Sequence, residues 1–153
     1  MIRRREFLMS SLFPAALSAQ KPVTRFQIAC MTLPYSAFPL ERALSGLKRS
    51  GYEYVAWGVN HKEADGKSKP VMAVDAPAAE AAKLAARCRD IGLEPVMMFS
   101  TVNLEAKEAG SAHAKRIEQA AAAKIPFLLT FGKTTGGEYD TVIRNLKEMG
   151  PLA

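Results

Sequence analysis

Apolar runs and amphipathic stretches alternate along the chain from residue 26 onward. Four runs are predicted to be buried strands, at residues 26–31, 53–57, 94–100 and 126–131. Each is followed by a stretch whose apolar residues recur at helical spacing. Parallel neighbouring strands need a crossover of about a dozen or more residues, which a helix supplies. The pattern therefore predicts an α/β fold, a parallel sheet covered by helices.

The expected helices follow the strands in the same order. The first stops at Gly51, and the second starts with Asp75 as its N-cap and stops at Gly92. The third is rich in alanine and spans about residues 104–124. The apolar residues that recur at helical spacing in the four helices are these: Leu40, Ala43, Leu44 and Leu47; Leu84, Ala85, Cys88 and Ile91; Ile117, Ala120 and Ala121; Val142, Ile143, Leu146 and Met149.

Four such units make half of an eight-stranded barrel, a fold that needs about 250 residues where this chain has 153. We therefore expect parallel (β/α) units, four of the eight of a TIM barrel, over residues 24–153. A half or truncated barrel leaves its outer strands unpaired, which predicts self-association through open sheet edges. A doubly wound, flavodoxin-like sheet is less favoured, because no phosphate motif follows the first strand at a helix start.

The first 20 residues have the features of an export signal. Three arginines at 3–5 precede a short, mildly apolar run and small residues at 15–19 that suit a signal peptidase. The frame Arg4-Arg5-Glu6-Phe7-Leu8 is similar to a twin-arginine signal, so we expect cleavage between Ala16 and Gln20. This predicts an exported protein, periplasmic or otherwise extracytoplasmic. No stable membrane span is expected, since one needs about 20 apolar residues.

Charge and cysteine content narrow the possible partners. Of the net charge of +6, the first 19 residues supply +2, and the remaining charges are interleaved along the chain. No basic stripe with interleaved aromatic residues is present, so nucleic acid is not an expected partner. Cys30 and Cys88 lie in apolar surroundings without metal-ligand spacing, which predicts buried, inert thiols. An exported compartment would also permit a disulfide between them.

Four features together resemble a known family: the leader, residues 52–58, the run Gly92-Leu93-Glu94-Pro95-Val96-Met97-Met98-Phe99, and Leu129-Thr130-Phe131-Gly132. They are similar to the N-terminal half of sugar phosphate isomerases/epimerases of the xylose isomerase-like barrel superfamily. The resemblance implies a (β/α)₈ barrel that binds Mn²⁺, Mg²⁺, Co²⁺ or Zn²⁺ and moves a proton next to a sugar carbonyl. It also implies a small carbohydrate or related polyol as partner.

The same resemblance places the metal ligands, Glu, Asp and His, at strand ends of the second half. No metal ligand or catalytic residue is therefore assigned in this chain, and it is expected to be a truncated or fragmentary version that can be inactive. Proton abstraction next to a carbonyl needs both a base and an electrophile, which one half of a barrel does not assemble.

Three side chains near the ends of predicted strands are substrate-binding candidates. His61 follows the second strand at the expected rim and could bind substrate or shuttle a proton, or be a solvated loop residue. Trp57 could stack on a sugar face or fill the top of the barrel. Lys133 follows Gly132 and could hold a phosphate or carboxylate, or be a solvated cation.

Other polar groups fit structural roles better. Glu63 and Asp65 share a long polar loop over residues 58–70, and His113 lies in the alanine-rich helix, where we expect it at the surface. The glycine-rich turn at residues 132–138 matches neither common nucleotide-binding motif. A non-catalytic α/β module that binds a small ligand or associates with itself remains the alternative function.

Overall fold

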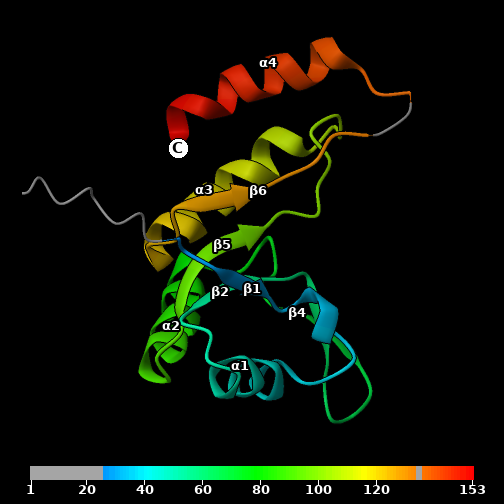
Figure 1. Cartoon of the computed structure of the whole chain (residues 1–153). Helices are drawn as coiled ribbons and strands as arrows, with labels where there is room; N and C mark the ends of the chain where they lie inside the picture. Colours follow the sequence, from blue (N-terminus) through cyan, green and yellow to red (C-terminus); the bar gives the residue numbers. More distant parts are fainter. Residues whose placement is uncertain (1–25, 134–135) are drawn as a thin grey trace, which may run out of the picture.

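The computed structural model describes residues 26–133 and 136–153 (Figure 1). The predicted leader lies outside the described residues. The elements are β1 (Ala29–Met31), α1 (Leu40–Arg49), β2 (Tyr54–Trp57), β3 (Asn60–Lys62), β4 (Ser68–Pro70), α2 (Ala78–Asp90), β5 (Glu94–Phe99), α3 (Ala109–Ala123), β6 (Phe127–Leu129) and α4 (Tyr139–Met149), with 3₁₀ turns at Leu33–Tyr35 and Gly150–Leu152. No helix in this part of the chain is long and apolar enough to cross a membrane.

Four strands form a parallel sheet in the order β1-β2-β5-β6, which confirms the predicted parallel sheet of β/α units. Each strand of the sheet therefore pairs with the sheet strand that follows it along the chain. A flavodoxin-like sheet places its first strand between the second and third, so the observed order is wrong for that fold.

Helices α1, α2 and α3 pack on one face of the sheet (Figure 1). Side chains alternate between the two faces of a strand, and one set is buried against these helices. That set includes Val55 and Trp57 of β2 and Met98 of β5, all at most 1% exposed. Helix α4 lies beyond α3, at the end of the molecule opposite α1 (Figure 1). Its Asn145 side-chain amide donates to the Leu104 carbonyl at 2.6 Å.

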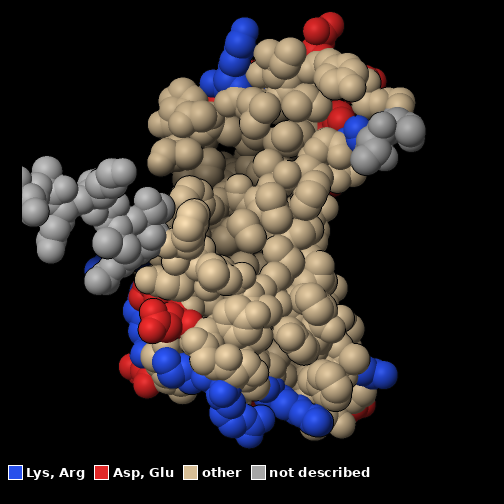
Figure 2. Space-filling model, viewed as in Figure 1, with Lys and Arg blue, Asp and Glu red and all other residues tan. Residues whose placement is uncertain are grey.

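The opposite face of the sheet is also apolar, and no helix of the described chain packs on its centre. The strand register aligns Met31, Ala56, Met97 and Phe127 in one row across all four strands, which we call the open-face row. Phe127 at the β6 end of the row is 59% exposed. Figure 2 shows that Lys, Arg, Asp and Glu gather around α1 and α4 and leave the centre of the viewed side uncharged.

The first strand is shorter and more exposed than predicted. Phe26 and Ile28 are 82% and 68% exposed, so the expected continuous buried strand over residues 26–31 is wrong at its beginning. Only Ala29–Met31 pair with β2. The reason is position in the sheet, because β1 has a neighbour on one side only and the residues before Ala29 extend past the end of β2.

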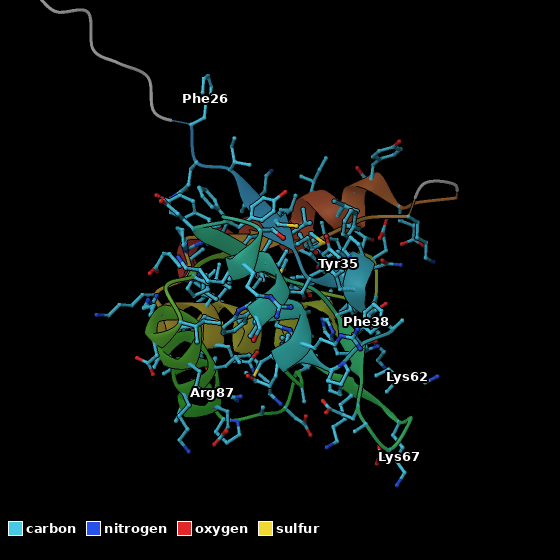
Figure 3. The ribbon with its side chains drawn as sticks, turned by 60° about the horizontal axis from the view of Figure 1, so that its bottom comes forward. Phe26, Tyr35, Phe38, Lys62, Lys67 and Arg87 are labelled. Atoms are coloured by element: carbon cyan, nitrogen blue, oxygen red, sulfur yellow. The ribbon has the colours of Figure 1, made fainter. Side chains whose placement is uncertain are left out.

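The expected long polar loop is a β-hairpin in the structure. Strands β3 and β4 pair antiparallel, and Gly66 takes a positive φ of 80° in the turn between them. The Asp65 carboxylate accepts the Lys67 backbone N–H at 2.9 Å, a local bond that favours such turns. Lys62 and Lys67 project outward from this hairpin (Figure 3).

The starts of α2 and α3 differ from the predicted ones, and at α3 a loop hydrogen bond replaces a helical one. Helix α3 begins at Ala109 and not near residue 104, because the Leu104 N–H donates to the Phe131 carbonyl at 2.9 Å and holds that segment beside β6. Helix α2 begins at Ala78, after Pro77. Ile91, expected on its buried face, is 40% exposed because it lies past the last helical residue.

An ion pair ties three elements together on the helix side. The Arg89 guanidinium makes three bonds of 2.7–3.1 Å to the Glu94 carboxylate and donates to the Ala123 carbonyl at 2.9 Å. These bonds hold the pKa of Glu94 below its usual range. The end of α2, the start of β5 and the end of α3 thus share one guanidinium.

The open-face row and the unpaired outer edges of β1 and β6 predict self-association. In a dilution series followed by multi-angle light scattering, the chain should show species heavier than its 16.6 kDa at tens of micromolar. Phe127→Lys should shift the population toward monomer, because the introduced charge would be buried at the contact.

Ala86→Lys is the matched control, since Ala86 is exposed on α2 and lies on the other side of the sheet. It should leave the mass distribution unchanged. A wild-type chain that stays monomeric at every concentration would contradict the prediction.

Candidate functional site

The carboxyl ends of the four parallel strands meet at one edge of the sheet, which we call the C-terminal edge. Thr32, Gly58, Ser100 and Thr130 follow β1, β2, β5 and β6 there. The Gly58 N–H donates to the Thr32 hydroxyl at 2.9 Å. A Cβ at Gly58 would lie 2.7 Å from the Leu33 backbone nitrogen, so only glycine fits this close approach. The edge is therefore built on a fixed backbone contact between β1 and β2.

A cavity of about 400 Å³ opens at this edge. Its walls are residues 57–60 at the end of β2, Met98, Phe99 and Thr101 at the end of β5, residues 70–74 before α2, and Arg116 of α3. Apolar side chains dominate the walls, and the side-chain polar groups come from Asn60, Thr101 and Arg116. Cavities of about 300–1,000 Å³ with few polar groups are typical of small-molecule sites.

Arg116 is the most unusual lining residue. It is 4% exposed, and burial lowers the pKa of its guanidinium. Its Nη1 donates to Gln119 Oε1 at 2.8 Å, while its Nε is buried without a hydrogen-bond partner. None of the ion pairs among residues 26–133 and 136–153 includes it. A buried cation without a counter-ion is costly, so this group is poised for an anion.

Gln119 links Arg116 to the segment that precedes α2. Its side-chain N–H groups donate to the carbonyls of Ala73 at 2.9 Å and Ala76 at 2.8 Å. The sequence prediction missed both residues, although Arg116 is four positions from Ala112 and from Ala120, on one helical face. That spacing was the available signal, and the alanine-rich composition of the helix obscured it.

Trp57 lines the cavity and also belongs to the core. It is 1% exposed, packs with the helix-facing side chains, and its indole Nε1 is buried without a hydrogen-bond partner. Trp57 therefore fills the core, as one of its two predicted roles had it, and it also forms part of the cavity wall. As the one tryptophan of the chain, it also provides a fluorescent reporter of the cavity.

His61 and Lys133 do not line this cavity. His61 is 1% exposed on β3, and its Nδ1 donates to the Phe38 carbonyl at 2.8 Å, while its Nε2 has no partner. It is thus no solvated loop residue, and it fastens the hairpin to the segment before α1. Lys133 is exposed. The structure therefore brings Trp57, but neither of the other two candidates, to the cavity, and their role in binding substrate stays a prediction.

His113 is buried, so the expected surface position is wrong. It is 2% exposed; its Nδ1 donates to the Ala109 carbonyl at 2.8 Å, and its Nε2 accepts from the Thr130 hydroxyl at 2.7 Å. These partners set the proton on Nδ1. Helix α3 turns this face toward β6, a packing that the local sequence does not reveal.

The glycine-rich turn after β6 holds an anion of the chain itself. The Glu105 carboxylate accepts the Lys133 backbone N–H at 2.9 Å. A Cβ at Gly132 or at Gly137 would lie 3.1 Å from Glu105 Oε1, so both glycines make room for this carboxylate. In the described part of the turn, the Lys133 N–H thus already has an acceptor from within the chain.

The donors near the C-terminal edge do not fit a complete metal site. Within the described ranges, no three His, Cys, Asp or Glu side chains gather to hold a metal ion. The Thr32 and Thr130 hydroxyls and Glu105 Oε1 already bond to the protein, and Glu105 Oε2 is a single buried oxygen without a partner. Hard divalent cations need several oxygen ligands or a carboxylate and imidazole set. We therefore assign no metal-dependent step to these residues.

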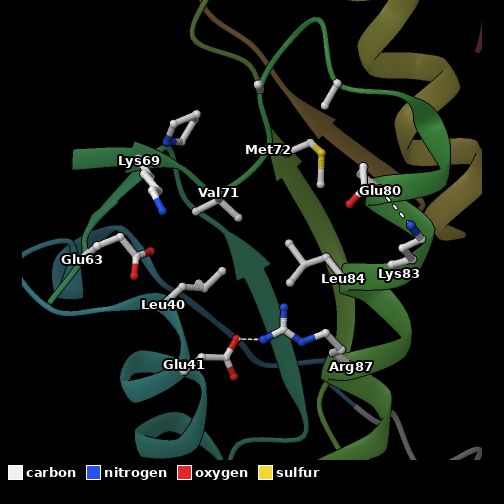
Figure 4. A pocket seen from close by; sticks show the side chains of 13 residues that line it. Leu40, Glu41, Glu63, Lys69, Val71, Met72, Glu80, Lys83, Leu84 and Arg87 are labelled. Carbon is white, nitrogen blue, oxygen red and sulfur yellow. Dashed lines mark hydrogen bonds and ion pairs between the residues drawn. The ribbon is translucent and has the colours of Figure 1, made fainter. Parts of the chain in front are cut away.

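A second cavity, of about 580 Å³, lies between α1, α2 and residues 69–73 (Figure 4). Its charged groups largely satisfy one another, since Arg87 pairs with Glu41 and Lys83 with Glu80. Those four side chains are all more than half exposed. The groove has no buried, unsatisfied group aimed into it, which makes it a weaker candidate than the cavity at the C-terminal edge.

The His113–Thr130 contact can be tested by stability. Thr130→Val removes the hydroxyl and leaves a buried imidazole nitrogen unsatisfied, which should lower the free energy of unfolding by about 1–3 kcal/mol. Urea denaturation followed by circular dichroism measures this. Thr141→Val, which removes an exposed hydroxyl bonded to Glu138, should change it by less than about 0.5 kcal/mol. Equal effects of the two variants would contradict the assignment.

Comparisons with models of protein families, with curated proteins and with solved structures found no match for this chain.

Proposed function

We propose that the chain is a carbohydrate-binding (β/α) module of the sugar isomerase/epimerase type, with its ligand site at the C-terminal edge of the sheet. The observation that carries the proposal is the sequential parallel order β1-β2-β5-β6 with α1 to α3 on one face. This is the arrangement of consecutive units in a (β/α)₈ barrel, whose active sites lie at the C-terminal face.

The position of the cavity supports the proposal. It opens where β2 and β5 end, and it offers the Asn60 amide, the Thr101 hydroxyl and the Arg116 guanidinium to a ligand. Ser100, also at this edge, has a buried hydroxyl oxygen without a partner. Hydroxyls and amides of this kind can bind a polyol by hydrogen bonds, with Trp57 at the base of the site.

The described residues suit binding better than proton transfer. Isomerisation next to a carbonyl needs a base and an electrophile within reach of one substrate atom. His61, the one imidazole near the end of β2, is turned to the Phe38 carbonyl and is 1% exposed. In the proposed division of work, this part of the chain orients the carbohydrate, and any divalent metal of the family would need donors beyond those described.

Binding without turnover is the expected behaviour of the purified chain. D-xylose or D-fructose should change the Trp57 fluorescence at millimolar concentration, while aldose–ketose interconversion with added Mn²⁺ should be undetectable. Thr101→Val should weaken binding about two- to tenfold, the effect of one lost hydrogen bond. Thr141→Val, at a half-buried residue of α4 that does not line the cavity, should not.

Two outcomes would contradict this proposal. If neither D-xylose nor D-fructose binds, the carbohydrate assignment is wrong. Turnover with Mn²⁺ would show that donors in this chain, such as His61, Glu63 and Asp65, complete a catalytic site.

We also propose that residues 1–20 direct export through the twin-arginine route, on the strength of Arg4, Arg5 and the small residues that follow. Replacing Arg4 and Arg5 together by lysine should retain the precursor in the cytoplasm of a bacterial host. Fractionation and immunoblotting measure this, with Arg3→Lys as the matched control. Continued export of the double variant would point to the general secretion route.

The uncovered sheet face favours a second candidate function, a non-catalytic α/β module that binds a small ligand or associates with itself. The open-face row and the exposed Phe127 support this alternative. Both candidate functions use the same four-stranded sheet, but the second one requires no catalytic groups.

A further inference from the structure

We propose that the cavity at the C-terminal edge binds a small organic carboxylate, held by the free edge of the Arg116 guanidinium. This inference rests on the proposed ligand site and names the chemical class of its ligand. It rests on the cavity, on the burial of Arg116, and on the way in which its hydrogen-bond donors are divided.

One edge of the guanidinium has no hydrogen-bond partner among the described residues. Nη1 is used by Gln119 Oε1 at 2.8 Å, and Gln119 is itself held by the carbonyls of Ala73 and Ala76. Nε has no partner and is buried, so the Nε side of the group is unsatisfied. The N–H groups on Nε and Nη2 are parallel and match the two oxygens of a carboxylate.

Arg116 lacks a negatively charged partner, which favours an anion as the ligand. Arg116 is 4% exposed, and no Asp or Glu among the described residues forms an ion pair with it. A guanidinium remains charged in proteins, so the described part of the fold contains a buried positive charge that none of its carboxylates pairs with. A bound carboxylate would neutralise it inside a site of low dielectric, where such a pair is strongest.

The cavity walls favour a carboxylate over phosphate. A phosphate group presents more oxygens than one guanidinium edge can satisfy, and sites for it commonly add several backbone N–H groups. The glycine-rich turn that could supply these groups already holds Glu105. The remaining walls are mainly apolar, with Val71, Met72 and Met98 among them, and suit the carbon skeleton of a small acid.

Matched pairs of probes test the inference on the full chain. Trp57 fluorescence should report D-glucuronate binding at least tenfold tighter than D-glucose, its neutral counterpart, and tighter than inorganic phosphate. Arg116→Met should abolish the preference for D-glucuronate. Lys115→Met removes the same charge from an exposed position one residue away and should preserve it.

Two further readouts cover a variant that fails to fold. Arg116→Lys keeps a cation but loses the paired donors, and should lower D-glucuronate affinity at least threefold. In the unsubstituted protein, the Arg116 Nε–H resonance in ¹H–¹⁵N spectra should shift on adding D-glucuronate and stay in place with D-glucose.

The outcomes separate this inference from the proposed function. Equal binding of D-glucose and D-glucuronate, insensitive to Arg116→Met, would overturn the carboxylate site and leave carbohydrate binding standing. Arg116-dependent binding of benzoate with no binding of either sugar would support the carboxylate site and remove the carbohydrate assignment. Tighter binding of phosphate than of D-glucuronate would overturn the choice of carboxylate. Binding of neither D-glucuronate nor benzoate would overturn the carboxylate site, and D-xylose and D-fructose test the carbohydrate assignment separately.

Discussion

The described structure depends on one buried layer, where the helix-facing side chains of the parallel sheet meet α1, α2 and α3. Val55, Trp57 and Met98 provide the sheet side of this layer, and Leu44, Ala85 and Ala123 belong to the helix side. Small alanines let α2 and α3 approach the sheet closely. Because side chains alternate along a strand, filling this layer sends every second strand residue to the opposite face. The open-face row is the direct result, and it places Met31, Ala56, Met97 and Phe127 on the face that no described helix covers.

The β/α units could be predicted because their signal is local. Periodic apolar residues and the turns at Gly51 and Gly92 mark helices and strands whatever they pack against, and both glycines take positive φ angles of 87° and 78°. The β3–β4 hairpin was missed because its residues are polar and its pairing depends on the turn at Asp65 and Gly66. The exposure of Phe26 depends on which strand lies at the sheet edge, a property that composition does not carry.

In the candidate site, too, some residues could be predicted from a local signal and others depend on tertiary packing. Its place at the C-terminal edge follows from the parallel topology, and Trp57 could be placed there from its position at the end of a strand. Arg116 and His113 could not, because the direction in which α3 faces is decided by tertiary packing of an alanine-rich helix. The two features whose chemistry favours an anion therefore have opposite outcomes. The glycine-rich turn is satisfied within the chain by Glu105, whereas the Nε edge of Arg116 is left for something else.

The sequential strand order also bears on how the fold forms. Each strand of the sheet pairs with the next sheet strand along the chain, so a new unit needs only the unit before it in order to dock. The loops that must close are short compared with those of a sheet whose first strand lies in the middle, and short closures cost less entropy. The Arg89–Glu94–Ala123 contact joins three elements that follow one another along the chain, so neighbours in the sequence are here also neighbours in space.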